Sequence, residues 1–133
     1  MRDLTRREYA ALLRLDLCAF AQRCFHELSP GAAFVPGGYI ELLASRLEAV
    51  RAGETKRLIV NIPPRYLKSL LGSVALPAWW LGHDPSAQIV CVSYAQDLAD
   101  KLSRDCRAVM AAPWYQGLFS TRLSRSRQTS SPP

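Results

Sequence analysis

Apolar side chains recur at helical spacing through the first part of the chain. They follow Thr-Arg-Arg-Glu at 5–8, a capping box in which each end side chain satisfies a free backbone amide of the other. The apolar stripe predicts one long helix that ends at the Ser-Pro-Gly cluster of 29–31; it consists of Tyr9, Leu12, Leu13, Leu17, Phe20, Cys24 and Leu28. A second stripe predicts a helix over 39–52 that ends at Gly53. Residues 1–53 are therefore interpreted as an amino-terminal helical segment.

After Gly53 the pattern changes to short, continuous apolar runs. Residues 57–62 and 88–94 are rich in β-branched side chains, and helical periodicity lies between them and after them. Continuous apolar strands that are joined by a helical crossover are typical of a parallel sheet covered on both faces. The sequence therefore predicts an α/β fold with a parallel sheet in βαβα order.

Two helices complete this predicted unit. The first covers about 69–81 and is bent or ended early by Pro77. The second begins at a capping box, Ser-Tyr-Ala-Gln at 93–96, and continues to about Ala112. From residue 120 onward arginines alternate with serines and prolines follow, which predicts a disordered basic Ser/Pro tail over 120–133.

Composition and charge narrow the class of protein. The 133 residues are enough for one domain, and 49% of them are hydrophobic, as in a folded chain. The net charge is +6, and all but three of the 17 basic residues are arginines, which favours a polyanionic partner. No apolar run reaches the roughly 18 residues of a membrane span, and no secretory signal opens the chain. We therefore expect a cytoplasmic protein that has no membrane partner.

The four cysteines do not have the spacing of a zinc site, and no histidine cluster accompanies them. Cys91 lies in an apolar run, and the other three lie in helical patterns. The sequence therefore predicts four buried, reduced thiols.

The residues with the clearest chemical pattern follow the first predicted strand. A loop that leaves a parallel strand and enters a helix through Lys68 and Ser69 has the order of a phosphate-binding loop. The general pattern requires glycine where this chain has Ile62 and Leu67. By spacing alone, the segment is therefore either a phosphate loop or the end of a strand followed by an exposed first helical turn. Arg65 would add charge-assisted bonds to an anion.

The whole segment, Pro-Pro-Arg-Tyr-Leu-Lys-Ser at 63–69, resembles the deviant Walker A loop of tailed-phage terminase large subunits, the ATPases that package viral DNA. The resemblance covers about residues 18–125. It includes the blocks at 28–31, 34–36, 57–62, 78–85, 92–99, 105–110 and 113–115. Under this resemblance, residues 54–119 form the first half of a P-loop ATPase domain.

The resemblance implies a role for each loop residue. Lys68 contacts the β- and γ-phosphates of ATP, Ser69 ligates Mg²⁺, and Arg65 senses the γ-phosphate, so that Lys68 and Arg65 are the catalytic candidates. The remaining cradle residues are Pro63, Pro64, Tyr66 and Leu67. The implied cofactors are ATP and Mg²⁺, and an aromatic or polar residue within 34–39 is implied to hold adenine.

The family's later motifs do not follow in this sequence. No apolar strand that ends in acidic residues comes after Val92, and the acidic metal cluster of a nuclease is missing. Phosphoryl transfer needs such carboxylates to hold the metal and orient the nucleophile. We therefore expect a truncated chain that does not hydrolyse ATP, although the full-length family member is an ATPase with a nuclease.

The implied partners are double-stranded DNA and, in the full-length form, the terminase small subunit and the portal protein. ATP hydrolysis would then drive DNA into a procapsid in the cytoplasm of a bacterial host, from a phage or prophage gene. Two alternatives stay open. One is a fragment of another P-loop motor such as a helicase, and the other is a small basic non-enzymatic protein that binds DNA or a phage partner.

Overall fold

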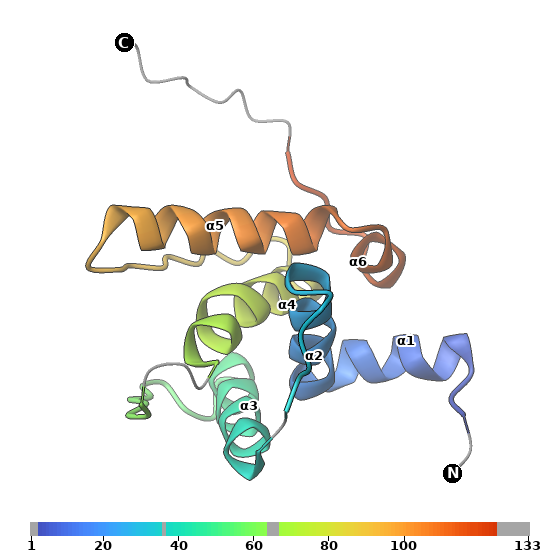
Figure 1. The fold of residues 1–133 in the computed structure, drawn as a ribbon, viewed down its shortest axis with the longest axis horizontal. Coiled ribbons are helices and arrows are strands. Elements are labelled where there is room, and N and C mark those ends of the chain that lie inside the picture. Colours follow the sequence, from blue (N-terminus) through green and yellow to red (C-terminus); the bar gives the residue numbers. More distant parts are fainter. Residues whose placement is uncertain (1–2, 36, 64–66, 125–133) are drawn as a thin grey trace.

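Every regular element in the described part of the chain is a helix (Figure 1). The computed structural model describes residues 3–35, 37–63 and 67–124. The elements are α1 (Arg6–Leu15), α2 (Leu17–Leu28), α3 (Gly38–Arg51), the π-helix η1 (Leu70–Ala75), α4 (Leu76–His83), α5 (Gln96–Ala111) and α6 (Pro113–Leu118). The predicted tail over 120–133 lies outside the described residues from residue 125 onward.

The predicted α/β fold with a parallel sheet is wrong for the described residues. Neither of the two predicted strands, 57–62 and 88–94, forms a regular element, and Figure 1 contains no arrow. No backbone hydrogen bond joins one of these segments to the other within the described ranges. The βαβα order is therefore replaced by helices that are linked by two irregular apolar segments.

The two segments form no sheet because, within the described ranges, neither pairs its backbone with a neighbouring strand. Leu58, Val60 and Ile62 pack against the helical core, while Ile59 between them is 86% exposed. Val90 and Val92 are 85% and 90% exposed. A β-branched run fits a pleated surface, but a strand is stable only when a second strand satisfies its backbone groups. Local composition indicates that the residues fit a pleated surface, but it does not indicate whether a second strand lies beside them.

The long helix predicted over the first stripe is two helices that meet at Asp16. The Asp16 carboxylate accepts hydrogen bonds from the backbone amides of Cys18 (2.9 Å) and Ala19 (3.4 Å), as an N-cap residue does. The capping box at the start of α1 is confirmed, since the Thr5 amide donates to Glu8 (2.8 Å) and the Glu8 amide donates to Thr5 (3.2 Å). The helix expected over 39–52 is also confirmed as α3, and Gly53 follows it with a φ of +83°.

The helix around Pro77 continues to His83 instead of ending early. Proline cannot donate a helical hydrogen bond, and its ring crowds the carbonyl four residues before it. The turn before Pro77 is widened, and the Leu76 amide donates to the Leu71 carbonyl five residues back. This π-helical turn lets η1 run directly into α4.

The carboxy-terminal helices differ from the sequence pattern in two details. Helix α5 is present, but it begins at Gln96 without a side-chain cap, so the predicted capping box at 93–96 is wrong. Helix α6 was not predicted, although Pro113 is a typical first helical residue.

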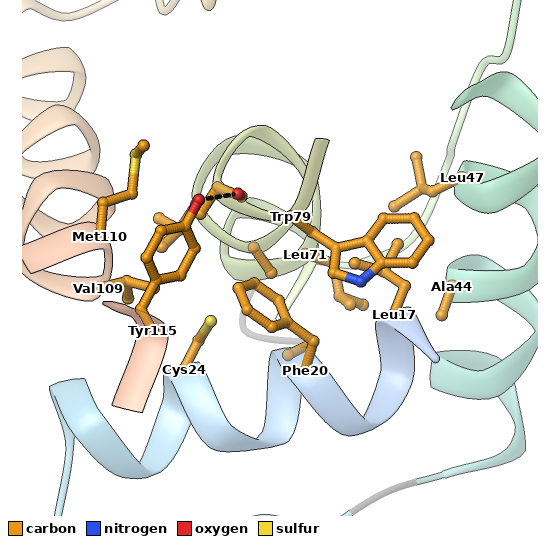
Figure 2. Close-up of a cluster of buried hydrophobic side chains, with 14 of the residues drawn as sticks. Leu17, Phe20, Cys24, Ala44, Leu47, Leu71, Trp79, Val109, Met110 and Tyr115 are labelled. Atoms are coloured by element: carbon orange, nitrogen blue, oxygen red, sulfur yellow. Dashed lines mark hydrogen bonds between the residues drawn. The ribbon is translucent and has the colours of Figure 1, made fainter. Parts of the chain in front are cut away.

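The core lies where η1 and α4 pass between α2 and α5 (Figure 1). Phe20 of α2 is fully buried and makes ring contacts with Trp114, Tyr115 and Phe119, at centroid distances of 5.6–6.3 Å. In Figure 2 the Phe20 ring lies between Tyr115 and Trp79. The Tyr115 hydroxyl, also buried, donates to the Ala78 carbonyl at 2.7 Å and so ties α6 to α4.

A second junction joins the end of α1 to α4. The Trp79 indole donates to the carbonyls of Leu13 (3.3 Å) and Arg14 (3.1 Å), which have no partner within their own helix. The His83 ring lies 2.7 Å from the same Arg14 carbonyl. The orphan carbonyls at the end of α1 are thereby satisfied by side chains of α4.

The prediction of four buried, reduced thiols is correct only in part, because Cys18 and Cys106 are half-buried and Cys91 is exposed. All four cysteines are free, and Cys24 is buried, where burial strongly raises the pKa of its thiol. Cys106 is half-buried, and burial raises its pKa to about 11. Cys91 is exposed, because the apolar run that contains it is not a buried strand. The prediction of a buried thiol is therefore wrong for Cys91.

Replacing Tyr115 by phenylalanine tests the buried hydrogen bond to Ala78. The ring packing is kept and one buried hydrogen bond is lost, so we expect Tyr115→Phe to lower the free energy of unfolding by about 1 kcal/mol. Urea denaturation followed by circular dichroism measures this. The control is Tyr94→Phe, where the side chain is 97% exposed and no change is expected. If Tyr115→Phe and Tyr94→Phe are equally stable, the hydrogen bond from Tyr115 to Ala78 does not stabilise the core.

His83 makes the stability depend on pH. Burial lowers the pKa of His83 from its ordinary value of 6.5; the nearby guanidinium groups of Arg51 and Arg14 lower it further, against the opposing effect of the hydrogen bond to Arg14. The unfolded chain thus binds a proton more readily than the folded chain, so stability falls as the pH drops below about 6.5.

We expect His83→Gln to flatten this decline in unfolding free energy between pH 7 and pH 5, measured by urea titrations. The matched control is His26→Gln, because His26 lies exposed on α2. This variant should retain the decline in unfolding free energy. An identical pH dependence in wild type and His83→Gln would show that other groups cause it.

Candidate functional site

The predicted phosphate-binding residues lie at the start of the buried helix formed by η1 and α4. Lys68 and Ser69 are its first helical residues, and the Leu71 amide closes the first turn on the Leu67 carbonyl at 3.0 Å. Pro63 lies exposed at the end of the preceding irregular segment. Three predicted loop residues, Pro64, Arg65 and Tyr66, lie outside the described residues.

Leu67 has the backbone conformation that normally favours glycine. Its φ is +61°, which makes it the one residue other than glycine with a positive φ in the described ranges. A leucine in this left-handed region costs about 1–2 kcal/mol, because its Cβ crowds the next carbonyl. The general phosphate-loop pattern has glycine immediately before the lysine, and here Leu67 occupies that position with the glycine-like backbone. The mismatch of residue type is visible in the sequence, whereas the left-handed backbone of Leu67 is not.

Lys68 and Ser69 are free to meet a ligand. Both side chains are exposed, Lys68 forms no ion pair with another described residue, and the Ser69 hydroxyl makes no capping bond. The amides of the first helical turn have no intrahelical partner and carry the positive end of the helix dipole. A cation, a hydroxyl and free amides at one helix start suit an anion such as phosphate.

Two cavities meet at Leu67, and both are also lined by Phe25 of α2. The first, of about 380 Å³, is further lined by Phe34 and Tyr39, from the segment for which the resemblance implies an adenine contact. The second, of about 520 Å³, is lined by Ser69 together with residues of α5. The structure thus brings Leu67 and Ser69 of the predicted loop, and part of the predicted adenine segment, to adjacent hollows.

Phe34 also packs in the protein interior, since its ring lies 5.3 Å from that of Phe25. Phe25 itself was missed by sequence reasoning, because only tertiary packing places α2 beside Leu67. Lys101 and Asp105 on α5 were missed too; they form an ion pair of 2.7 Å and line the Ser69 cavity. Their i, i+4 spacing is visible in the sequence, but their position beside Ser69 is not.

The donor set fits a phosphate better than a bare metal ion. No group of three or more His, Cys, Asp or Glu side chains suited to a metal occurs within the described ranges. Mg²⁺ in nucleotide sites keeps several waters and takes few ligands from the protein, so one serine hydroxyl is compatible with a magnesium ion that is carried by phosphates.

No family model, curated protein or solved structure matches this chain. In the described part of the chain, no helix is both long enough and apolar enough to cross a membrane.

Substitutions at Leu67 separate backbone strain from side-chain packing. Leu67→Ala and Leu67→Gly remove the same contacts, but only glycine adopts a φ of +61° without strain. We expect the glycine variant to be more stable than the alanine variant by about 1 kcal/mol in urea denaturation.

The control is Ala108→Gly at an exposed position inside α5, where glycine should be less stable than alanine by about 1 kcal/mol. The same sign at both positions would mean that the Leu67 backbone is not strained.

Proposed function

We propose that this chain is the nucleotide-binding portion of a DNA-packaging ATPase similar to the terminase large subunits, and that it binds Mg-ATP through residues 63–69. Lys68 contacts the β- and γ-phosphates, Ser69 ligates Mg²⁺ and Arg65 senses the γ-phosphate. In terminase large subunits, ATP hydrolysis drives double-stranded DNA into a procapsid, together with a small subunit and a portal protein. The proposal for this chain concerns nucleotide binding.

One observation carries the proposal. Lys68 and Ser69, the last two residues of the terminase-like segment, are the exposed first residues of a helix, and Leu67 before them has the left-handed backbone that normally favours glycine. The two adjoining cavities support it, because one has aromatic walls suited to a base and the other contains Ser69. The proposal does not require the predicted sheet, since these features belong to the helix start, to α2, α3 and α5, and to the segment that precedes α3.

Lys68→Ala tests the phosphate contact directly. Loss of a charge-assisted hydrogen bond corresponds to about 2 kcal/mol, so we expect the dissociation constant for Mg-ATP to rise at least about tenfold. Isothermal titration calorimetry on the intact chain measures this. Lys56→Ala is the matched control, because it removes the same charge from an exposed lysine outside the loop.

The measurement also discriminates between the proposed function and its main alternative. If Lys68→Ala binds Mg-ATP as tightly as Lys56→Ala does, the phosphate-loop assignment is wrong. Salt-sensitive binding to duplex DNA that ignores ATP and survives Lys68→Ala would instead favour a small basic DNA-binding protein.

A further inference from the structure

A second surface, far from Lys68 in the sequence, has the form of a docking groove. Helices α1 and α6 lie beside each other at the right of Figure 1, and α1 also contacts α2. Between these three helices is a hollow of about 830 Å³. Its apolar lining includes Tyr9, Leu13, Trp114 and Leu118, and Tyr9 is 42% exposed. We refer to this hollow as the α1–α6 groove.

The edge of the α1–α6 groove is strongly basic. Four arginines line it, and no lining residue is acidic; the four are Arg6, Arg7, Arg14 and Arg23. Arg6, Arg7 and Arg14 form no ion pair with another residue in the described ranges. Three uncompensated guanidinium groups therefore surround an apolar floor.

Arg23 is held in place by its neighbours. Its guanidinium carbon lies 4.7 Å from the centre of the Trp114 ring, and the guanidinium forms an ion pair with the Glu27 carboxylate at 3.6 Å. The same Glu27 carboxylate accepts the Trp114 indole hydrogen bond at 3.2 Å. The Trp114 side chain, which forms one wall of the groove, is thus held by a cation–π contact with Arg23 and a hydrogen bond to Glu27.

We propose that the α1–α6 groove binds an acidic amphipathic helix of a partner protein. The apolar floor requires a ligand with an apolar face, and the three unpaired arginines require carboxylates beside that face. A helix with leucines at every third or fourth position and glutamates at its flanks provides both in one element.

The apolar floor of the groove favours an acidic amphipathic helix over other anionic ligands. Duplex DNA would meet the arginines through its phosphates but would leave Tyr9 and Leu118 without apolar contact. The proposal is also independent of the nucleotide site, because the α1–α6 groove shares no lining residue with the two cavities beside Leu67.

The test uses a fluorescein-labelled peptide of about 15 residues, which spans about 22 Å as a helix. It carries leucines on one face and glutamates on both flanks, and its binding to the intact protein is followed by fluorescence anisotropy. We expect the triple variant Arg6→Gln, Arg7→Gln, Arg14→Gln to raise the dissociation constant about tenfold or more. We expect Tyr9→Ser to weaken binding several-fold through the lost apolar contact.

Matched controls isolate the groove. Arg46→Gln, Arg104→Gln, Arg107→Gln removes three exposed arginines from α3 and α5, and it should bind the peptide as the wild type does. Lys68→Ala should also leave peptide binding unchanged, so that failure of the nucleotide site and failure of the groove are distinguishable. Circular dichroism verifies that each variant is folded.

Several results would overturn the proposal. These are absence of peptide binding, equal weakening by the two triple variants, and equal affinity for a peptide in which glutamine replaces every glutamate. Displacement of the peptide by duplex DNA, with DNA binding unaffected by Tyr9→Ser, would assign the arginines to nucleic acid instead.

Discussion

The burial of the helix formed by η1 and α4 is the constraint on which the rest of the structure depends. Its buried side chains include Leu71, Val74, Ala75, Ala78 and Trp79, so apolar residues face outward in several directions. A helix that is apolar on most sides is stable only when other elements surround it. Helix α2 covers one side and α5 another, and Tyr115 reaches the Ala78 carbonyl from α6. The positions of the other helices follow from this requirement.

The same constraint places the candidate phosphate site. Because the helix is buried from Leu71 onward, its start must emerge at the surface, and Lys68 and Ser69 are the residues exposed there. Leu67, directly before Lys68, has a left-handed backbone. The strain at Leu67 is offset by its packing beside the core. A glycine would adopt this backbone without strain but would lose that contact.

Sequence patterns predicted the helices well where the pattern and the local signals agree. The stripe of α3 and the capping box at Thr5 and Glu8 both rest on interactions between near neighbours, and both are confirmed. The break at Asp16 escaped the periodicity because apolar residues continue in phase on both sides of it, although aspartate is a typical N-cap residue. The start of α6 has a local signal too, since Pro113 is a typical first helical residue.

The failed prediction of a sheet has a different cause. Residues 57–62 have the composition of a strand, yet strand formation depends on a pairing partner that composition does not specify. The same limit applies to the site: the exposed helix start at Lys68 was predictable, whereas Phe25 beside Leu67 and Asp105 beside Ser69 depend on tertiary packing. The sequence therefore predicted the candidate residues of the site, but it did not predict which residues of other helices lie beside them.

The two proposed sites are positioned by the same buried helix. Its first turn carries Lys68 and Ser69, and near its end Trp79 and His83 bond to the Arg14 carbonyl. Arg14 in turn lines the α1–α6 groove, so α4 fixes one wall of that groove through the backbone of α1. Tyr115 ties α6, which forms the opposite wall, to the same helix. The groove can therefore keep its form without a ligand, because both of its walls are attached to the same buried helix.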